Sequence, residues 1–394
     1  MTWTGWGASP ISSQWSSGQR DGFAAKKSGF NSSSDRRAMC ACRKAVLLDG
    51  GFSTQLETNV GGEQVDGHPL WSARFLASHP DAVMQTHLDF LRAGAEVIIT
   101  NTYQASIDGF KQYLDLPREE SLRLMARAVE VAKEAVETYM RENPACKVRP
   151  LIAGSVGPYG ASLHDGSEYT GEYAATVSRE TLAQWHRPRI EALVAAGVDL
   201  LALETIPSQK EAEVLVELIK EFPRVQAWIS FSAKEPVEER EQSSSEGSTE
   251  NYHQISYGER LKDVAHECWS RNSHQLVAIG VNCLNPKYVT SLLSDVNEEG
   301  RPHIPLIVYP NSGEVYSPKT GWTDPDNVPS VDSYVEEWLS LGVEYVGGCC
   351  RTNAKDIARM RAHVDRWLKD GTFTGPQGIV STNSSCNTSS VGCH

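Results

Sequence analysis

Three cysteines stand where thiolates from different parts of the chain can meet: Cys283, and the adjacent pair Cys349 and Cys350. Each group comes just after a short apolar run. Neighbouring side chains in a strand point to opposite faces, so the pair can converge only where the chain leaves the strand, at Gly347 and Gly348. Three protein ligands with an open fourth position are typical of a catalytic zinc. Alone, Cys283 would be read as a small buried apolar residue, but together the residues predict Zn²⁺ held by three thiolates.

Further polar residues follow other apolar runs. Asp49 comes after the first run, Glu204 after the fourth and Asn282 after the sixth. The alternatives are a turn or capping role for Asp49, a paired core carboxylate for Glu204 and satisfaction of backbone groups by Asn282. We favour ligand contacts for the two acids, because Gly50 and Gly51 would let a ligand approach backbone N–H groups beside Asp49.

Eight short apolar runs are the elements that must position these residues. Continuous apolar runs suit strands that are buried on both faces of a parallel sheet. The runs are 45–48, 97–99, 151–153, 200–203, 227–231, 277–281, 306–308 and 345–346. Helical patterns lie between most of them; one begins near Pro80 and stops at Gly94.

Three helix-to-strand joints share one pattern. Gly94, Gly197 and Gly342 are each followed by a small residue, an acid and an apolar run. Repeated joints of this kind indicate βα units, and eight strands predict a parallel α/β fold, the (β/α)8 TIM barrel. An open doubly wound sheet is the main alternative, but 49–52 lacks its spaced three-glycine fingerprint. Barrels place their chemistry at the C-terminal ends of strands, where the polar residues of this sequence stand.

Composition divides the 394 residues into a core and polar segments. We expect the barrel over 45–370, a disordered Ser- and Gly-rich tail over 1–44 and a second polar tail over 371–394. A polar stretch at 235–258 reads as a surface insertion after the fifth run, on the side expected to carry the active site.

Charge and cysteine usage restrict the partners and the compartment. A net charge of −13 argues against nucleic acid and against an anionic membrane surface. No apolar run approaches the roughly 18 residues of a membrane span. Nine cysteines without a framework spacing are typical of a reducing compartment. We therefore expect a cytoplasmic protein; a basic, Ser-rich transit peptide within 1–44 would instead direct it to an organelle. The sequence indicates no oligomeric state.

Taken in order, the strand-end motifs resemble the zinc-dependent homocysteine S-methyltransferase family over about residues 45–370. The resembling segments are Leu48-Asp49-Gly50-Gly51, Thr100-Asn101-Thr102-Tyr103, Gly154-Ser155-Val156-Gly157-Pro158, Glu204-Thr205-Ile206-Pro207, Gly280-Val281-Asn282-Cys283 and Gly347-Gly348-Cys349-Cys350. Singly most are weak signals, but their order and spacing are specific. The polar tail and the insertion depart from the family pattern.

The resemblance implies a barrel that transfers a methyl group to the sulfur of homocysteine and so forms methionine. It implies that Cys283, Cys349 and Cys350 bind Zn²⁺. It also implies that Asp49 and Glu204 hold the ammonium group of homocysteine.

The remaining site residues follow from the same resemblance. The backbone of Gly50, Gly51 and Phe52 would receive the substrate carboxylate, and Asn282 would line the site.

The chemistry explains why such groups are needed. A thiol with a pKa of about 8.5 is mostly protonated at neutral pH, and coordination to a metal deprotonates it. The partner must be a cationic methyl donor, which the aromatic rings of Trp71 or Tyr103 would steady unless they serve only in packing.

Donor identity stays open at this point. The short form of the family generally uses S-methylmethionine, sometimes S-adenosylmethionine, and the chain has no room for further folate and cobalamin domains. Betaine is the nearer alternative donor. Two alternatives to the methyltransferase are a zinc-thiolate barrel of other chemistry and a non-catalytic barrel that senses redox state or stores zinc.

Overall fold

Eight strands lie in the positions of the eight apolar runs. They are β1 (Val46–Leu47), β2 (Val97–Ile99), β3 (Leu151–Val156), β4 (Leu200–Ile206), β5 (Gln226–Phe231), β6 (Leu276–Asn282), β7 (Leu306–Tyr309) and β10 (Val343–Val346). The computed structural model describes residues 45–61, 65–234, 253–317, 321–323 and 328–370. A short antiparallel hairpin of β8 (Val315–Ser317) and β9 (Gly321–Thr323) follows β7 and was not expected from the sequence.

The eight strands form one parallel sheet that closes on itself. Its order is β1-β10-β7-β6-β5-β4-β3-β2. A parallel bridge between Leu48 and Val97 joins the two ends of that order, and the Asp49 amide donates to the Val97 carbonyl at 3.1 Å. The predicted (β/α)8 barrel is therefore confirmed, and the open doubly wound sheet is excluded.

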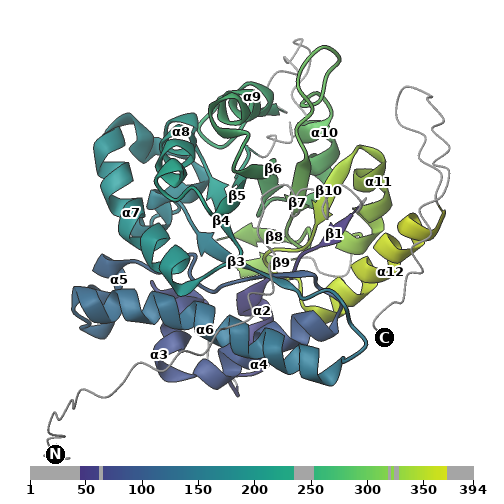
Figure 1. Cartoon of the computed structure of the whole chain (residues 1–394). Helices are drawn as coiled ribbons and strands as arrows, with labels where there is room; N and C mark the ends of the chain where they lie inside the picture. Colours follow the sequence, from purple (N-terminus) through teal and green to yellow (C-terminus); the bar gives the residue numbers. More distant parts are fainter. Residues whose placement is uncertain (1–44, 62–64, 235–252, 318–320, 324–327, 371–394) are drawn as a thin grey trace, which may run out of the picture. The chain divides into compact units, whose positions relative to one another are not determined.

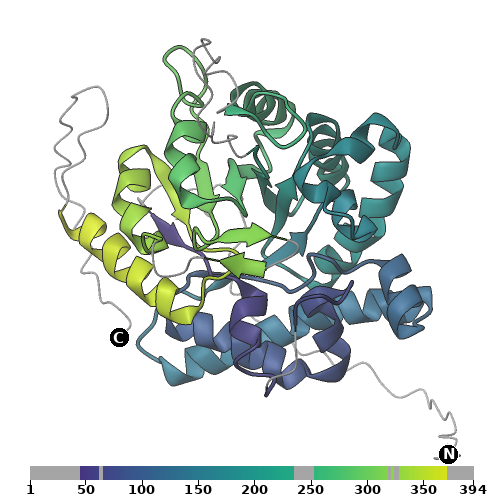
Figure 2. The ribbon, with the colours of Figure 1, turned by 180° about the vertical axis from the view of Figure 1, so that it is seen from behind.

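Helices surround the strands in both views (Figures 1 and 2). They are α2 (Phe52–Leu56), α3 (Phe75–Ser78), α4 (Pro80–Arg92), α5 (Ile107–Leu114), α6 (Arg118–Glu142), α7 (Arg179–Ala196), α8 (Gln209–Leu218), α9 (Leu261–Asn272), α10 (Val289–Leu293), α11 (Val335–Ser340) and α12 (Ala354–Asp370). At least one helix separates each pair of consecutive barrel strands, as a right-handed parallel crossover requires.

Local sequence sets where helices begin and where they end before the strands. Pro80 stands at the first turn of α4, where its missing N–H costs no hydrogen bond. Gly94, Gly197 and Gly342 have φ angles of 99°, 85° and 95°. This left-handed region is open to glycine without steric cost, so the three predicted helix-to-strand joints are confirmed.

Side chains alternate along the strands between an outer apolar layer and the barrel interior. In β5, Ile229 and Phe231 belong to the core shared with the helices. The intervening Trp228 and Ser230 instead contact Tyr309 of β7, at 2.9 Å from Trp228 Nε1 and 2.5 Å from Ser230 Oγ to Tyr309 Oη. Because β6 separates β5 from β7 in the sheet, these contacts cross the barrel interior.

The predicted tails 1–44 and 371–394 and residues 235–252 of the predicted insertion lie outside the described residues. Across the described ranges, none of the helices combines the length and the apolarity of a bilayer-spanning segment.

Candidate active site

The three predicted metal ligands meet at one end of the barrel. Cys283 follows β6, and Cys349 and Cys350 follow β10. Their sulfur atoms all lie within 4.8 Å of one another, and Cys283 Sγ is 3.7 Å from Cys350 Sγ. A tetrahedral zinc with Zn–S bonds of about 2.3 Å places its thiolate sulfurs roughly 3.8 Å apart. The three thiols therefore fit a thiolate-bound metal of this kind.

The backbone after β7 braces both cysteine segments. Cys283 N donates to the Tyr309 carbonyl at 3.2 Å, and Cys349 N donates to the Pro310 carbonyl at 2.7 Å. Ser312 N donates in turn to the Cys350 carbonyl at 3.0 Å. Three consecutive strand ends thus hold the thiols together before any ligand binds.

A left-handed turn and close backbone packing aim the thiols. Cys283 has φ 55°, a strained value for a residue with a side chain. A Cβ atom at Gly348 would lie 2.2 Å from Thr352 Oγ1. Only glycine lets Thr352 approach so closely. The expected departure from the strand is present, because β10 ends at Val346, directly before Gly347 and Gly348.

Hydrogen bonding within the cluster shifts the pKa of Cys283 in the opposite direction to the pKa values of Cys349 and Cys350. The pKa of Cys283 lies well below its usual range, first because Cys349 and Cys350 donate to it and also because Tyr169 and Asn311 do. The same bonds to Cys283 raise the pKa of Cys349 and of Cys350. Cys283 therefore loses its proton more readily than Cys349 or Cys350 does, and a bound dication would displace the protons that the thiols still hold.

Two buried carboxylates lie beside the thiols. The Asp49 carboxylate accepts from the Ile99 amide at 2.7 Å through Oδ2, whereas its buried Oδ1 has no hydrogen-bond partner among the described residues. Glu204 accepts a hydrogen bond from Ser155 Oγ. Burial raises the pKa of Asp49 well above its ordinary value, and the nearby Glu204 charge adds to the rise. Burial likewise raises the pKa of Glu204 to about 7. An unpaired carboxylate oxygen next to a second carboxylate suits a cationic ligand.

The predicted glycines serve the packing of the segment that carries Cys349 and Cys350. A Cβ atom at Gly51 would lie 2.3 Å from the Cys349 carbonyl oxygen. The Gly51 amide donates to Thr352 through both its side-chain and carbonyl oxygens, each at 3.0 Å. This N–H is therefore already satisfied within the protein. Gly50 packs near Phe90 in the same way.

Phe52 begins α2, next to these glycines. Its ring lies 4.8 Å from the His87 ring, centroid to centroid. Burial lowers the pKa of His87 to about 3, so the imidazole beneath Phe52 is neutral.

The Asn282 side chain forms hydrogen bonds with neighbouring residues of the protein. Its Oδ1 accepts from Thr205 N and from Ser230 Oγ, and its Nδ2 donates to Thr205 Oγ1, each at 2.8 Å. Thr205 has φ 58°. Asn282 thus holds Thr205, a residue with a strained backbone that directly follows Glu204. In this way it fixes the direction of the Glu204 carboxylate.

Two residues at the thiols were missed by the sequence reasoning. Tyr169 Oη lies 3.1 Å from Cys283 Sγ, and the adjacent Glu168 has a buried Oε2 with no partner among the described residues. Burial raises the pKa of Glu168 to about 7, and the Cys283 charge contributes. Both belong to a short 3-10 helix, Ser167–Tyr169, in the loop after β3. Strand-end patterns carry no signal for residues so far into a loop.

The aromatic residues considered for the donor pack against each other. The Trp71 and Tyr103 rings meet edge to face with centroids 6.1 Å apart. Burial raises the pKa of Tyr103 well above its ordinary value, and the charges of Glu168 and Cys283 add to the rise. Tyr103 therefore adjoins the same space as the thiols and stays neutral.

A buried arginine, also missed, holds the loop that carries Tyr103. Arg189 of α7 donates to the carbonyls of Ala105, Gly157 and Tyr103 at 2.7, 3.0 and 2.9 Å. Burial lowers its pKa only to about 10, so it remains charged at neutral pH. One side chain therefore ties the loops after β2 and β3 to a helix.

Comparison with known proteins agrees with this geometry. The family model described as homocysteine S-methyltransferase matches residues 46–364. A betaine-homocysteine S-methyltransferase from Drosophila melanogaster is 47% identical over 82% of this chain and 95% of its own length. A homocysteine S-methyltransferase from Escherichia coli is 39% identical over 83% of this chain and 97% of its own length. The metallated form of the E. coli homocysteine methyltransferase MmuM superimposes with a TM-score of 0.69 at 38% identity, covering 83% of this chain and 99% of that structure. The chain therefore belongs to the homocysteine S-methyltransferase family and is a methyltransferase that acts on homocysteine.

Proposed function

We propose that this methyltransferase uses Zn²⁺ held by Cys283, Cys349 and Cys350 and takes its methyl group from S-methylmethionine. The observation that carries the proposal is the convergence of three thiols within 4.8 Å beside two buried carboxylates. When bound, zinc supplies the positive charge that ionises a coordinated thiol at neutral pH.

Protein side chains orient the amino acid. Asp49 and Glu204 receive the homocysteine ammonium, which supplies the missing partner of Asp49 Oδ1. A bound cation also lowers the pKa of both acids, so they are ionised in the complex. Asn282 and Ser155 hold Glu204 in place through Thr205 and through a direct hydrogen bond.

The transfer is a displacement at carbon. The homocysteine sulfur attacks the donor methyl carbon, a new C–S bond forms, and the bond to the donor sulfonium breaks with its electron pair on the donor sulfur. The thiol proton leaves to solvent, and S-methylmethionine and homocysteine become two molecules of methionine. Tyr103 and Trp71 offer their rings to the sulfonium.

Betaine is the second candidate donor, and the 47% identity to a betaine-homocysteine S-methyltransferase favours it. A donor panel with homocysteine decides between them. We expect methionine formation with S-methylmethionine to exceed that with S-adenosylmethionine and with betaine; betaine as the preferred donor would overturn the assignment.

Metal analysis tests the zinc site independently of the donor. We expect one zinc per chain in freshly purified, reduced protein, and its loss in Cys283→Ser. Cys146→Ser is the matched control, because Cys146 is a partly exposed free cysteine outside the cluster. Protein without zinc would contradict the proposal. Zinc without methyl transfer from any donor would favour the other zinc-thiolate chemistries or zinc storage. We also propose a cytoplasmic location, in line with the nine cysteines that lack a framework spacing.

A further inference from the structure

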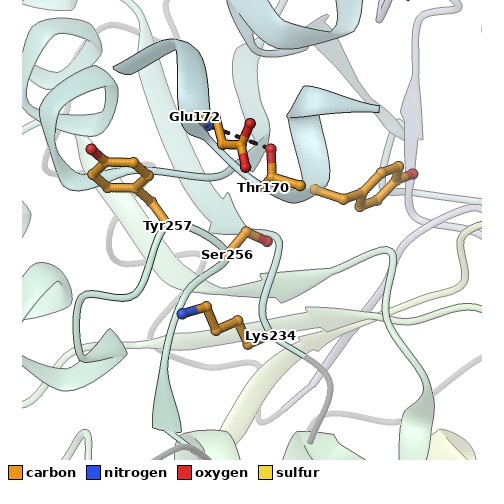
Figure 3. A pocket seen from close by; sticks show the side chains of 6 residues that line it. Thr170, Glu172, Lys234, Ser256 and Tyr257 are labelled. Atoms are coloured by element: carbon orange, nitrogen blue, oxygen red, sulfur yellow. Dashed lines mark hydrogen bonds between the residues drawn. The ribbon is translucent and has the colours of Figure 1, made fainter. Parts of the chain in front are cut away.

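A charged cleft opens beside the thiol cluster, and Tyr169 belongs to both. Its volume is about 360 Å³, and it is lined by Tyr169, Thr170, Glu172, Lys234, Ser256 and Tyr257 (Figure 3). The first three residues belong to the loop after β3, and the last three to the segments after β5. The cleft thus lies between two loops at the active-site end of the barrel.

Hydrogen bonds build the floor of this cleft. Ser232, at the end of β5, donates to the Glu168 carbonyl at 2.8 Å. Ser256 donates to Ser232 Oγ at 2.9 Å, and its amide donates to the Ser232 carbonyl at 3.0 Å. All three serine-mediated contacts are buried or partly buried, so the two loops are joined at fixed positions.

One wall depends on a glycine. Gly171 has φ 71°, and a Cβ atom there would lie 2.9 Å from Tyr257 Cβ. The Tyr257 amide donates to the Pro207 carbonyl at 2.9 Å, which ties this wall to the end of β4. The cleft is therefore part of the packed structure.

The cleft presents two opposite charges that are not paired with each other. Glu172 and Lys234 are both exposed, and in Figure 3 they stand on opposite sides of Ser256. The Lys234 ammonium lies 3.4 Å from Gln254 Oε1. No ion pair joins either charge to another residue in the described ranges. An α-amino acid carries the complementary charges, an ammonium and a carboxylate on one carbon.

Tyr169 connects the cleft to the reacting sulfur. Its side chain lines the cleft, and its hydroxyl lies 3.1 Å from Cys283 Sγ. The two places are thus separated by one tyrosine side chain, on the order of 6 Å built from bonds of about 1.5 Å.

We infer that this cleft binds the head group of an α-amino-acid methyl donor, with Lys234 receiving its carboxylate and Glu172 its ammonium. The inference rests on the proposed methyl transfer and deepens it. In S-methylmethionine three bonds separate the sulfonium from the α-carbon, on the order of 4 Å. A head group in the cleft therefore leaves the methyl sulfonium near the thiol cluster.

Betaine fits this arrangement poorly. It has no ammonium hydrogen for Glu172, and two bonds separate its nitrogen from its carboxylate, on the order of 2.5 Å. With its carboxylate at Lys234, its methyl groups would stay at the rim of the cleft. The cleft thus distinguishes donors by the length and the charges of their head groups.

The test compares S-methylmethionine with dimethylsulfoniopropionate, which keeps a sulfonium and a carboxylate but lacks the α-ammonium. For Lys234→Ala we expect the KM of both donors to rise roughly three- to fivefold, as exposed charge pairs allow. For Glu172→Gln only the KM of S-methylmethionine should rise. The homocysteine KM should stay unchanged in both variants, and calorimetric titration of S-methylmethionine should show the same loss of affinity.

Matched controls are Lys111→Ala and Glu137→Gln, which remove exposed charges on α5 and α6. Unchanged donor KM in both cleft variants, with an active wild type, would overturn the inference while leaving methyl transfer intact. A wild type that uses only betaine would also overturn it. A wild type that forms no methionine from any donor would instead contradict the proposed function.

Discussion

The buried carboxyl group of Glu204 offers the sharpest test of the proposed substrate site. Burial raises the pKa of this carboxyl from 4.5 to about 7, although hydrogen bonds from Ser155 and Tyr309 act in the opposite direction. Such a difference means that folding disfavours the ionised carboxylate by on the order of 3 kcal/mol. A site that binds a cationic ligand bears this free-energy cost when no ligand is bound.

The direction in which stability changes with pH follows from the number of protons that the folded and unfolded states bind. Between pH 4.5 and about 7 the folded protein keeps a proton that the unfolded chain has lost, so this group makes the protein less stable as the pH rises. The cost is absent below that window and complete above it. Glu204→Gln removes the ionisation, and its amide oxygen still accepts from Ser155. In the absence of homocysteine, we therefore expect the variant to be more stable than wild type at pH 8 and equally stable at pH 4.5.

Thermal unfolding across this pH range measures the effect. At about 0.63 kcal/mol/K of unfolding entropy for roughly 300 ordered residues, the expected gain at pH 8 is roughly 5 °C. Both proteins are brought to the same metal content, so that the metal contribution cancels. Glu137→Gln, an exposed change on α6, is the control and should show no such trend. Homocysteine should stabilise wild type more than the variant. A stability difference that is independent of pH, or wild-type homocysteine affinity in the variant, would refute the reasoning.

Three further substitutions test the parts that hold the site. Gly51→Ala places a Cβ atom 2.3 Å from the Cys349 carbonyl oxygen. We expect the variant to lose about 2 kcal/mol or more of stability and to bind less zinc. A fully metallated variant with the wild-type Tm would contradict this packing role. Tyr169→Phe removes a hydroxyl 3.1 Å from Cys283 Sγ. In metal-free protein the Cys283 pKa should therefore rise, as measured by the ultraviolet absorbance of the thiolate. An unchanged titration would show that the hydroxyl does not stabilise the thiolate. Asn282→Ala frees Thr205; we expect the homocysteine KM to rise about tenfold with zinc retained, and loss of zinc with unchanged KM would place Asn282 in metal binding instead.

Local patterns were sufficient for much of this protein. Apolar runs mark strands because burial on both faces demands them, and glycines such as Gly197 mark helix ends because they accept a left-handed backbone. The thiols and the acids could be grouped because a barrel brings all C-terminal strand ends to one rim. The adjacent Cys349 and Cys350 and the order of the motifs therefore indicated the fold and the family.

Tertiary structure decided what depends on contacts between distant segments. The Gly51 amide, which the resemblance places near the substrate carboxylate, donates a hydrogen bond to Thr352, which lies 301 residues further on. Asn282 supports Thr205, because the β4 and β6 ends meet across the barrel interior. Tyr169 and Glu168 reach the thiols from within a loop, whose path no strand or helix period records. The sequence by itself determined which chemical groups the rim carries; only the closed barrel decided which of them remain free for ligands and which are used by the fold, because hydrogen-bond partners are set by proximity in space.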